Sequence, residues 1–396
     1  GFSYDANGDI IPNSGCGSWL MEGQSTNLIT QSEDFSDAYW TKNGASVVSG
    51  FVSPDGTANA FKLVEDTSTG AHLISRSLFG SGVNLAKYTL SVFAKKGERD
   101  LLVIQDGTTV NNAFFDLTNG VVDGITGAGT AKIESLGNHF YRCSFTFTQS
   151  GVDLRPQFAL ADITLSGSPP SYTGDGTSGV YIYGAQVEQN SFSTSLIPTS
   201  GASSTRLADI ATNSGNASLI NSEEGVLYVE LLNITSQSFD SITINDESVT
   251  DNNQVRIWFF NNTITYQYNI SGVASAQITS GTIDLTLENK IACSWKLNEF
   301  KLFVNGIKIN EDLSGNVLSI GVLKSLDFKR GRGDGNFYGK NKALAVYKTA
   351  LTDASLRSLT YPSAVATTFD LNFNTIADDF TFTRGSEATF VNAQGL

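Results

Sequence analysis

Residues that could carry catalytic chemistry are few in this sequence. Only two histidines occur among the 396 residues, His72 and His139, and neither stands in a nucleophile motif with serine or cysteine. No metalloprotease, phosphate-loop or dinucleotide-binding motif occurs. The sequence therefore predicts a protein that is not an enzyme. Its 39 acidic residues still leave room for a two-carboxylate glycosidase site, which sequence cannot exclude.

Binding chemistry has better candidates, because an aromatic ring can stack on the apolar face of a sugar beside Asp and Asn hydrogen bonds. The aromatic candidates are Trp40, Trp258, Tyr266 and Tyr338. The glycine-rich stretch 330–339 adds Asp334 and Asn336, whose oxygens are ligands that Ca²⁺ favours. Each also has a structural alternative, which is a core position for the rings and turn hydrogen bonds for Asp334 and Asn336.

The cysteines predict no disulfide framework. Cys16, Cys143 and Cys293 lie far apart, and an odd count does not suit paired bridges. Cys143 falls on the apolar side of an alternating strand, so a buried thiol is favoured over a redox role.

The composition indicates a turn-rich, all-β protein. The chain has 38 glycines, 25 phenylalanines and only 16% charged residues, with 40% hydrophobic residues to build cores. A net charge of −14 disfavours nucleic acid and anionic lipid as partners. No apolar run reaches the ~18 residues that a membrane helix needs, so membrane insertion is not expected.

Local patterns predict particular elements. Thr352 is the expected N-cap of one short helix near 352–360. Asn305-Gly306 and Asn261-Asn262 each stand between two alternating arms, which predicts hairpins. The stretch 88–97 ends in a lysine pair and a glycine, which is typical of an edge or terminal strand.

A composition shift predicts the domain boundary. Residues 199–209 are rich in Ser, Thr, Gly and Ala, as in a linker. The predicted organisation is two β-sandwich, jelly-roll-like domains plus a terminal strand segment. The predicted segments are an N-terminal partial module at 1–26, a first sandwich at 27–198, the linker at 199–209, a second sandwich at 210–361 and a C-terminal strand segment at 362–396.

Two motifs flank the first predicted sandwich. "EGQSTNL" at 22–28 precedes it, and "GAQVE" at 184–188 with "SLIPTSGASSTRLAD" at 195–209 closes it. Together they resemble modules of bacteriophage tail-fibre and other virion structural proteins, which look like jelly-roll carbohydrate-binding modules. This resemblance implies a virion or extracellular location.

The second predicted sandwich carries a different resemblance. "FKLFVNGIKI" at 300–309 and "LDFKRGRGDGNFYGKNKALAVYKTALTDASLRSL" at 326–359 are similar to the concanavalin A-like (laminin-G or pentraxin-like) lectin sandwich. This resemblance implies glycans or cell-surface polysaccharide as partners, and it leaves Ca²⁺ open as a cofactor. The expected function is a non-enzymatic structural or adhesion element. The alternatives are an accessory portion of a polysaccharide depolymerase and an architectural spacer.

The two ends of the chain resemble two halves of one module. In phage proteins of this kind, a stretch like "FTRGSEATFVNAQG" at 382–395 stands before a stretch like the one that begins here at Gly1. The terminal strand is therefore expected to complete the N-terminal region of its own chain or of a neighbouring copy, and pairing with a neighbour would build a head-to-tail filament. The third alternative is a chain cut from a longer repetitive precursor. The expected assembly residues of the terminal strand are Phe380, Phe382, Arg384 and Phe390.

Overall fold

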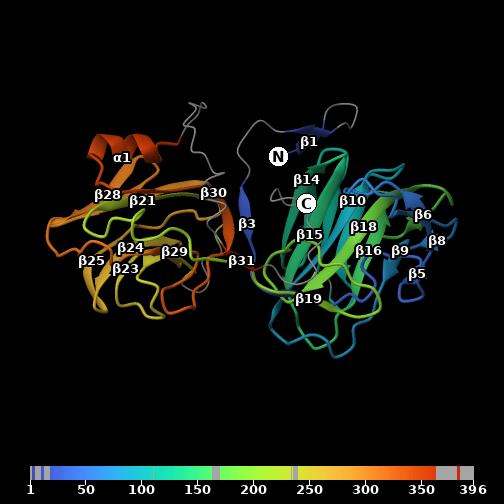
Figure 1. The fold of residues 1–396 in the computed structure, drawn as a ribbon. Coiled ribbons are helices and arrows are strands. Elements are labelled where there is room, and N and C mark those ends of the chain that lie inside the picture. The colour runs from blue at the N-terminus through green and yellow to red at the C-terminus, as the bar shows by residue number, and fades with distance from the viewer. Residues whose placement is uncertain are drawn as a thin grey trace. The chain divides into compact units, whose positions relative to one another are not determined.

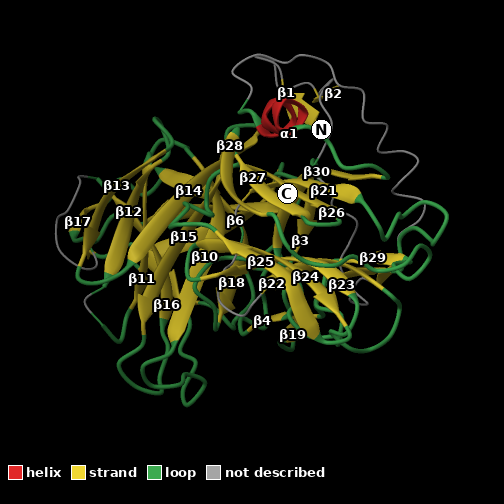
Figure 2. Cartoon of the chain, turned by 90° about the vertical axis from the view of Figure 1, so that its left-hand side faces the viewer, coloured by secondary structure: helices red, strands yellow, loops and turns green. Residues whose placement is uncertain are grey.

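The computed structural model describes residues 2–4, 10–12, 18–109, 111–162, 170–232, 234, 240–362 and 381–383. Its regular elements are antiparallel strands, apart from α1 (Asp353–Thr360), which is the one helix of this part of the chain (Figures 1 and 2). The prediction of an all-β protein with one short helix is confirmed. The chain divides into two compact units. We call Gln24–Leu207 the N-terminal sandwich, and Ser14–Gly23 together with Ala208–Ser386 the C-terminal sandwich.

The N-terminal sandwich contains two six-stranded sheets. The first has the order β14 (Thr130–Gly137), β15 (Phe140–Thr148), β10 (Lys87–Lys95), β18 (Gly179–Glu188), β7 (Ala60–Glu65) and β6 (Ala45–Phe51). The second has the order β13 (Val121–Thr126), β12 (Asn112–Asp116), β11 (Leu101–Asp106), β16 (Pro156–Ala161), β9 (Leu73–Ser75) and β5 (Thr41–Asn43). Two short pairs accompany them, β8 (Thr69–Gly70) with β17 (Tyr172–Thr173), and β4 (Ser25–Asn27) with β19 (Ser204–Arg206).

Alternate side chains of both sheets form the core of the N-terminal sandwich, because successive residues of a strand point to opposite faces. Leu90 and Phe145 from one sheet share a buried cluster with Ile104 and Phe158 from the other. β10 lies inside its sheet between β15 and β18, so the prediction of an edge or terminal strand was wrong. The lysine pair marks only the end of β10, where the Lys95 ammonium lies 5.6 Å from the centre of the Phe140 ring.

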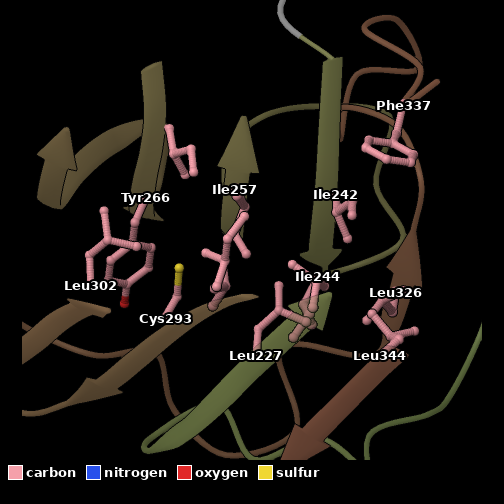
Figure 3. Packing of buried hydrophobic residues seen from close by; sticks show 14 of the residues in the cluster. Leu227, Ile242, Ile244, Ile257, Tyr266, Cys293, Leu302, Leu326, Phe337 and Leu344 are labelled. Atoms are coloured by element: carbon pink, nitrogen blue, oxygen red, sulfur yellow. The ribbon is translucent and has the colours of Figure 1, made fainter. Parts of the chain in front are cut away.

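The C-terminal sandwich packs a six-stranded sheet on a five-stranded sheet. The six-stranded sheet has the order β28 (Ile307–Asp312), β27 (Glu299–Val304), β26 (Asn289–Lys296), β21 (Gly225–Leu232), β30 (Gly339–Tyr347) and β3 (Trp19–Met21). The five-stranded sheet has the order β25 (Val273–Thr279), β24 (Thr263–Ile270), β23 (Gln254–Phe260), β22 (Asp240–Asn245) and β29 (Ser325–Asp327). Figure 3 shows the core, where the Tyr266 ring lies among side chains that include Leu302 and Cys293.

The hairpins and the helix form where the sequence predicts them. Asn305 and Gly306 have φ of 49° and 79° between β27 and β28, and Asn261 and Asn262 have φ of 47° and 59° between β23 and β24. Two successive left-handed residues form the turn that matches the twist of paired strands. The Thr352 side chain caps α1 by accepting a hydrogen bond from the Ser355 amide at 3.2 Å.

The two motifs that flank the N-terminal sandwich meet in the structure. Asn27, from the first motif, donates through Nδ2 to the Ala185 and Ile197 carbonyls at 3.1 and 3.0 Å. Its Oδ1 accepts from the amides of Ile29 and Val187 at 3.1 and 3.0 Å. Ala185, Val187 and Ile197 belong to the closing motif, so the two motifs join the ends of this sandwich through buried hydrogen bonds.

Segments near both chain ends contribute strands. β3 pairs with the first residues of β30, Gly339–Asn341, and β31 (Thr381–Thr383) pairs with β20 (Ile210–Thr212). Of the expected assembly residues, Phe382 belongs to β31, whereas Phe380, Arg384 and Phe390 lie outside the described residues. β19 lies within the stretch 199–209. β1 (Phe2–Tyr4) and β2 (Ile10–Pro12) pair with each other.

Candidate functional site

The five-stranded sheet of the C-terminal sandwich has one apolar and one polar face. On β23, Val255, Ile257 and Phe259 belong to the buried core. Their neighbours Gln254, Arg256 and Trp258 therefore point to the opposite face, because strand side chains alternate. We call this opposite side the polar face.

The strand register arranges the polar face in rows that cross the sheet, because directly paired residues point to the same side. The first row is Ser325, Asn245, Gln254 and Asn269. The second row is Asp327, Thr243, Arg256, Gln267 and Gln277. The third row is Ser241, Trp258, Thr265 and Thr279. Amides, hydroxyls, one carboxylate, one guanidinium and one indole ring thus lie side by side.

Two side chains of the polar face are buried and have no hydrogen-bond partner among the residues that the structure describes. Gln254 and Thr243 both have an exposed fraction of 0%. Among the described residues, neither Oε1 nor Nε2 of Gln254 has a partner, and neither does Oγ1 of Thr243. Leaving a buried polar group unpaired costs about 1–3 kcal/mol, and native proteins usually satisfy such groups with protein, water or a ligand.

Arg256 brings a positive charge to the same place. Its side chain is only 4% exposed, and its Nε donates to Ser241 Oγ at 2.9 Å. The guanidinium carbon lies 5.4 Å from the centre of the Trp258 ring, within cation–π range. Burial, reinforced by the nearby charge of Arg330, lowers the pKa of Arg256 to about 10, so the guanidinium stays charged at neutral pH.

The loop between β29 and β30 borders the polar face. Its Gly335 carbonyl accepts from the Ser241 amide at 2.9 Å, and Asn336 forms a parallel bridge with Ser241. Gly331 of this loop lies close to the β22–β23 connection, where an added Cβ would come within 2.5 Å of the Thr250 carbonyl oxygen and 2.9 Å of Gln254 Oε1. Glycine is therefore required there for the loop to approach the face.

Ion pairs hold the charged residues of this loop. Arg330 Nε donates to Asp251 Oδ2 at 2.6 Å, and Arg332 Nε donates to Asp334 Oδ2 at 2.9 Å. The nearby guanidinium groups, Arg332 foremost, hold the pKa of Asp334 below its usual value. The loop thus adds two balanced pairs beside the buried Arg256.

The structure brings four of the six predicted binding residues to one region. Trp258 is half-buried on the polar face and pairs across the sheet with Ser241, which is bridged to Asn336. Asn336 Nδ2 donates to the Tyr338 hydroxyl at 3.2 Å. Asp334 lies two residues before Asn336 in the same loop.

The other two predicted binding residues are core side chains. Trp40 is 1% exposed in the N-terminal sandwich, where its Nε1 donates to the Gln31 carbonyl at 2.9 Å. Tyr266 is 0% exposed in the C-terminal sandwich, and its hydroxyl donates to the Ser294 carbonyl at 3.1 Å. Both hydrogen-bonding groups are therefore satisfied inside the protein.

The predicted Ca²⁺ ligands do not form a donor set that fits the ion. Both carboxylate oxygens of Asp334 accept from Arg332 Nε, at 3.1 and 2.9 Å. Ca²⁺ takes six to eight oxygen ligands, and neighbouring guanidinium groups repel it. Within the described part of the chain, no group of three or more His, Cys, Asp or Glu side chains is arranged to hold a metal ion.

The histidine and thiol groups named above occupy structural or surface positions. The His72 side chain is buried, and its ring nitrogens face the carbonyl oxygens of Gly44 and Tyr172. His139 is exposed in the turn between β14 and β15. Cys143 and Cys293 are free and fully buried, and burial raises the pKa of both thiols. Cys16 lies outside the described residues.

Sequence reasoning missed Gln254, Thr243 and Arg256. A signal was present, because Gln254 and Arg256 share the parity of Trp258 in "QVRIWFF", whereas the apolar residues at 255, 257 and 259 occupy the other parity. A polar row of this kind predicts which side of a strand faces away from the core. Thr243 carries the same signal, because Ser241, Thr243 and Asn245 alternate with Ile242 and Ile244 in "DSITIN".

Comparisons with known proteins give weak structural similarities. No protein-family model and no curated protein sequence matches the chain. A sialidase carbohydrate-binding module (CBM40) from Ruminococcus gnavus has a TM-score of 0.32 and 14% identity, covering 38% of this chain and 93% of its own. A pentraxin from Limulus polyphemus has a TM-score of 0.33 and 10% identity, covering 45% of this chain and 88% of its own.

A third similar structure is domain 4 of an extracellular arabinanase from Geobacillus stearothermophilus, in complex with arabinotriose. Its TM-score is 0.29 at 17% identity, and the match covers 43% of this chain and 83% of that one. These neighbours are carbohydrate-binding modules and lectin-like domains. Their TM-scores are too low to support a function for this chain. Among the described residues, no helix has the length and apolar character needed to span a bilayer.

Proposed function

We propose that the C-terminal sandwich is a non-enzymatic glycan-binding module and that the polar face is its binding surface. One observation carries the proposal, namely that Gln254 and Thr243 are buried on this face with three polar atoms that have no partner in the described part of the chain. Buried polar atoms without partners destabilise a fold, and a bound ligand is one way to satisfy them. Sugar hydroxyls both donate and accept hydrogen bonds, so they suit an amide and a hydroxyl equally.

The surroundings of these atoms suit a sugar as well. Trp258 offers a half-buried ring on the same face, and Gln267 and Gln277 lie in the neighbouring row, joined by a hydrogen bond of 3.3 Å. Stacking on an aromatic ring, flanked by amides, is a general way for proteins to hold a pyranose. Asn336 and Tyr338 border this region from the loop.

The wider role that we propose is a structural or adhesion element of a phage tail fibre, a virion or an extracellular filament. The motifs at 22–28, 184–188 and 195–209 support this role through their resemblance to tail-fibre modules. Two rival roles give different binding results. An accessory portion of a depolymerase would bind one polysaccharide selectively, whereas a spacer would bind no glycan.

Gln254→Leu tests the proposed site. The change removes two unpartnered polar atoms and fills a similar volume, so thermal stability should stay equal or rise. Glycan binding, found first on a broad array and then measured by titration calorimetry, should fall at least about tenfold, which corresponds to 1.4 kcal/mol. Loss of affinity without loss of stability is the signature of a binding residue rather than a structural one.

Asn341→Leu is the matched control. Asn341 is also buried in the C-terminal sandwich, at 1% exposure, and its side-chain amide also lacks partners among the described residues. It lies on β30 in the other sheet. This variant should keep full glycan affinity. Equal losses in both variants, or an array on which no glycan binds, would overturn the proposal.

A further inference from the structure

We propose that β6 is a docking edge for a second copy of this chain, and that two copies pair through it as antiparallel strands. The proposal does not depend on glycan binding. β6 (Ala45–Phe51) is an edge strand of the first sheet of the N-terminal sandwich, and it pairs on one side only, with β7. An edge strand presents a row of backbone N–H and C=O groups that can pair with another strand.

The hydrogen bonds to β7 show which backbone groups of β6 point outward. The Asp66 amide donates to the Gly44 carbonyl at 2.9 Å, and this bond continues the register of the two strands. Because bonded and non-bonded pairs alternate in an antiparallel ladder, the N–H and C=O groups of Ala45, Val47 and Ser49 point away from β7. Within the part of the chain that the structure describes, these outward groups make no hydrogen bond.

The outward groups are self-complementary about Val47. When two copies of β6 run antiparallel with Val47 opposite Val47, Ala45 of each copy lies opposite Ser49 of the other. Each of these three pairs can exchange two hydrogen bonds, because the same groups point outward on both copies. A bulge at Gly50, which has φ of 96°, ends the regular ladder, so the seam consists of residues 45–49. The contact has twofold symmetry, so it joins two copies and then stops.

The side chains of β6 suit the same partner. Ala45 and Val47 are half-buried and pack against the core of the N-terminal sandwich. In the paired strands the two Val47 side chains lie side by side, so the apolar cores of the two copies become continuous. On the other side of the strand, Val48 has an exposed fraction of 49% and lies opposite Ser46 of the second copy. Pairing therefore covers apolar surface and buries no charge.

Charge distinguishes β6 from most other edges. The net charge of −14 makes copies of the chain repel one another, so they approach most easily at an uncharged surface. Charged side chains on an edge strand protect it against pairing. β6 contains no charged residue. Three other edge strands, β14, β13 and β28, contain Lys132 and Glu134, Asp123, and Lys308, Glu311 and Asp312.

The remaining edges are short or covered. β5, β3 and β29 have three residues each. β25 is uncharged and has seven residues, but Ser275 Oγ donates to the Asn316 carbonyl at 2.8 Å and accepts from the Asn316 amide at 2.9 Å. A Cβ added at Gly315 would come within 2.7 Å of the Ser275 carbonyl oxygen, so this segment lies close against β25. Among the edges of the four large sheets in the described residues, β6 alone is long, uncharged and uncovered.

The size of the seam sets the expected affinity. Five residues per copy are far fewer than the roughly 20–30 residues a side of a standard interface. We therefore expect a dissociation constant of about 0.1–1 mM. The chain should be a monomer at micromolar concentrations and should dimerise where its local concentration is high.

Sedimentation equilibrium and amide hydrogen exchange on the full chain test the proposal together. Between about 10 μM and about 1 mM, the average mass should rise from monomer toward dimer. Exchange at the amides of Ala45, Val47 and Ser49 should slow by about two- to fivefold, the factor by which the monomer fraction falls. The amides of Ser46 and Val48 point toward β7 and should change little. A monomer throughout this range, or a dimer in which the three outward amides are not slowed, would overturn the proposal.

Variants place the contact on β6. Val47→Pro removes an outward N–H that no bond to β7 uses, so it should leave a folded monomer and no dimer at about 1 mM. Val48→Lys adds a charge at a half-exposed position of the same edge and should weaken dimerisation at least severalfold. It keeps the test valid if circular dichroism shows that Val47→Pro misfolds.

Val273→Lys is the matched control. It makes the same charge change on β25, where Val273 is 70% exposed but the edge is covered. This variant should dimerise like the wild type. Equal weakening in Val48→Lys and Val273→Lys would show a general effect of charge, and an unchanged dimer in folded Val47→Pro or Val48→Lys would show a contact elsewhere. Either result would contradict the proposal.

Discussion

At the scale of single residues, Asn27 shows how a recognisable motif can be structural. Its amide uses two donated and two accepted hydrogen bonds, all to backbone groups of other strands and loops. An Asn side-chain amide can donate two hydrogen bonds and accept two, so the hydrogen-bonding capacity of Asn27 is fully used. The motif that resembles tail-fibre modules thus fixes the closure of the N-terminal sandwich rather than a ligand.

Asn27→Asp should therefore destabilise the N-terminal sandwich by about 2–4 kcal/mol, because it removes two donors and introduces a buried charge. Urea unfolding followed by tryptophan fluorescence measures the change. Thr26→Ala is the control, since Thr26 contacts Thr205 at the exposed surface, and it should cost less than about 0.5 kcal/mol. A similar loss of unfolding free energy in both variants would show that the hydrogen bonds of Asn27 stabilise the sandwich no more than the surface contact of Thr26 does.

The candidate site was only partly predictable at this scale. Trp258 and Tyr266 look alike as aromatic residues of alternating strands, yet Trp258 shares its face with Arg256, whereas Tyr266 pairs with the core residue Ile257. The two residues are distinguished by whether they share a side of their strand with the polar or with the apolar residues. Burial of Gln254 by the loop at Gly331 was beyond prediction, because it depends on contacts between segments about 75 residues apart.

At the scale of elements, Glu65 at the end of β7 ties several segments together. Its buried carboxylate accepts from Arg99 Nε and Nη2 at 2.8 and 2.7 Å, from the Tyr172 hydroxyl at 2.7 Å and from the Asp175 amide at 2.8 Å. Burial alone would raise the pKa of Glu65, but the hydrogen bonds, those of Arg99 foremost, bring it below the usual 4.5.

A lowered carboxyl pKa gives stability that is present above pH 4.5 and is lost as the pH falls through the folded-state value. Glu65→Gln should therefore destabilise the N-terminal sandwich at pH 7, and the difference from wild type should shrink below pH 4.5. Denaturant titrations at a series of pH values measure this. A difference that is constant from pH 7 to pH 3 would contradict the assigned cause.

Elements were predictable where local chemistry decides them. The Asn305-Gly306 and Asn261-Asn262 turns and the Thr352 cap follow from residues next to one another. The position of β10 does not, because a strand's place in a sheet depends on partners such as β18, about 90 residues away. The lysines at its end gave a misleading local signal.

At the scale of the whole molecule, the chain passes between the two sandwiches more than once. The described segment around β3 belongs to the C-terminal sandwich, Gln24–Leu207 form the N-terminal one, and the chain returns at Ala208. Met21 is 4% exposed and belongs to the core of the C-terminal sandwich. A residue near the start of the sequence thus stabilises a unit formed mostly by residues after 207.

Met21→Ala should lower the stability of the C-terminal sandwich by about 2–4 kcal/mol, since it leaves a cavity in that core. Differential scanning calorimetry should show a shift in the transition of the C-terminal sandwich only. That transition is identified as the one that a bound glycan, or a change in the same core such as Leu302→Ala, also shifts. A shift in the other transition would show that Met21 packs in the core of the N-terminal sandwich, and it would contradict this prediction.

We propose that the terminal strands can exchange between copies of the chain. β31 and β3 each pair over only three residues, so few pairing hydrogen bonds are lost when such a strand exchanges between protomers. Deletion of 378–396 should abolish higher oligomers in sedimentation while leaving a folded monomer. A misfolded monomer would instead show that the strand is needed within its own chain.

The two buried thiols allow the local opening of each sandwich to be measured separately. Cys143 lies in the core of the N-terminal sandwich, and Cys293 lies in the core of the C-terminal one. A thiol at 0% exposure reacts only when the surrounding structure opens, and the rate of that reaction gives the free energy of opening. With Cys16 replaced by serine, mass spectrometry of the labelled chain reads the local opening of both units from one sample, without dividing the protein.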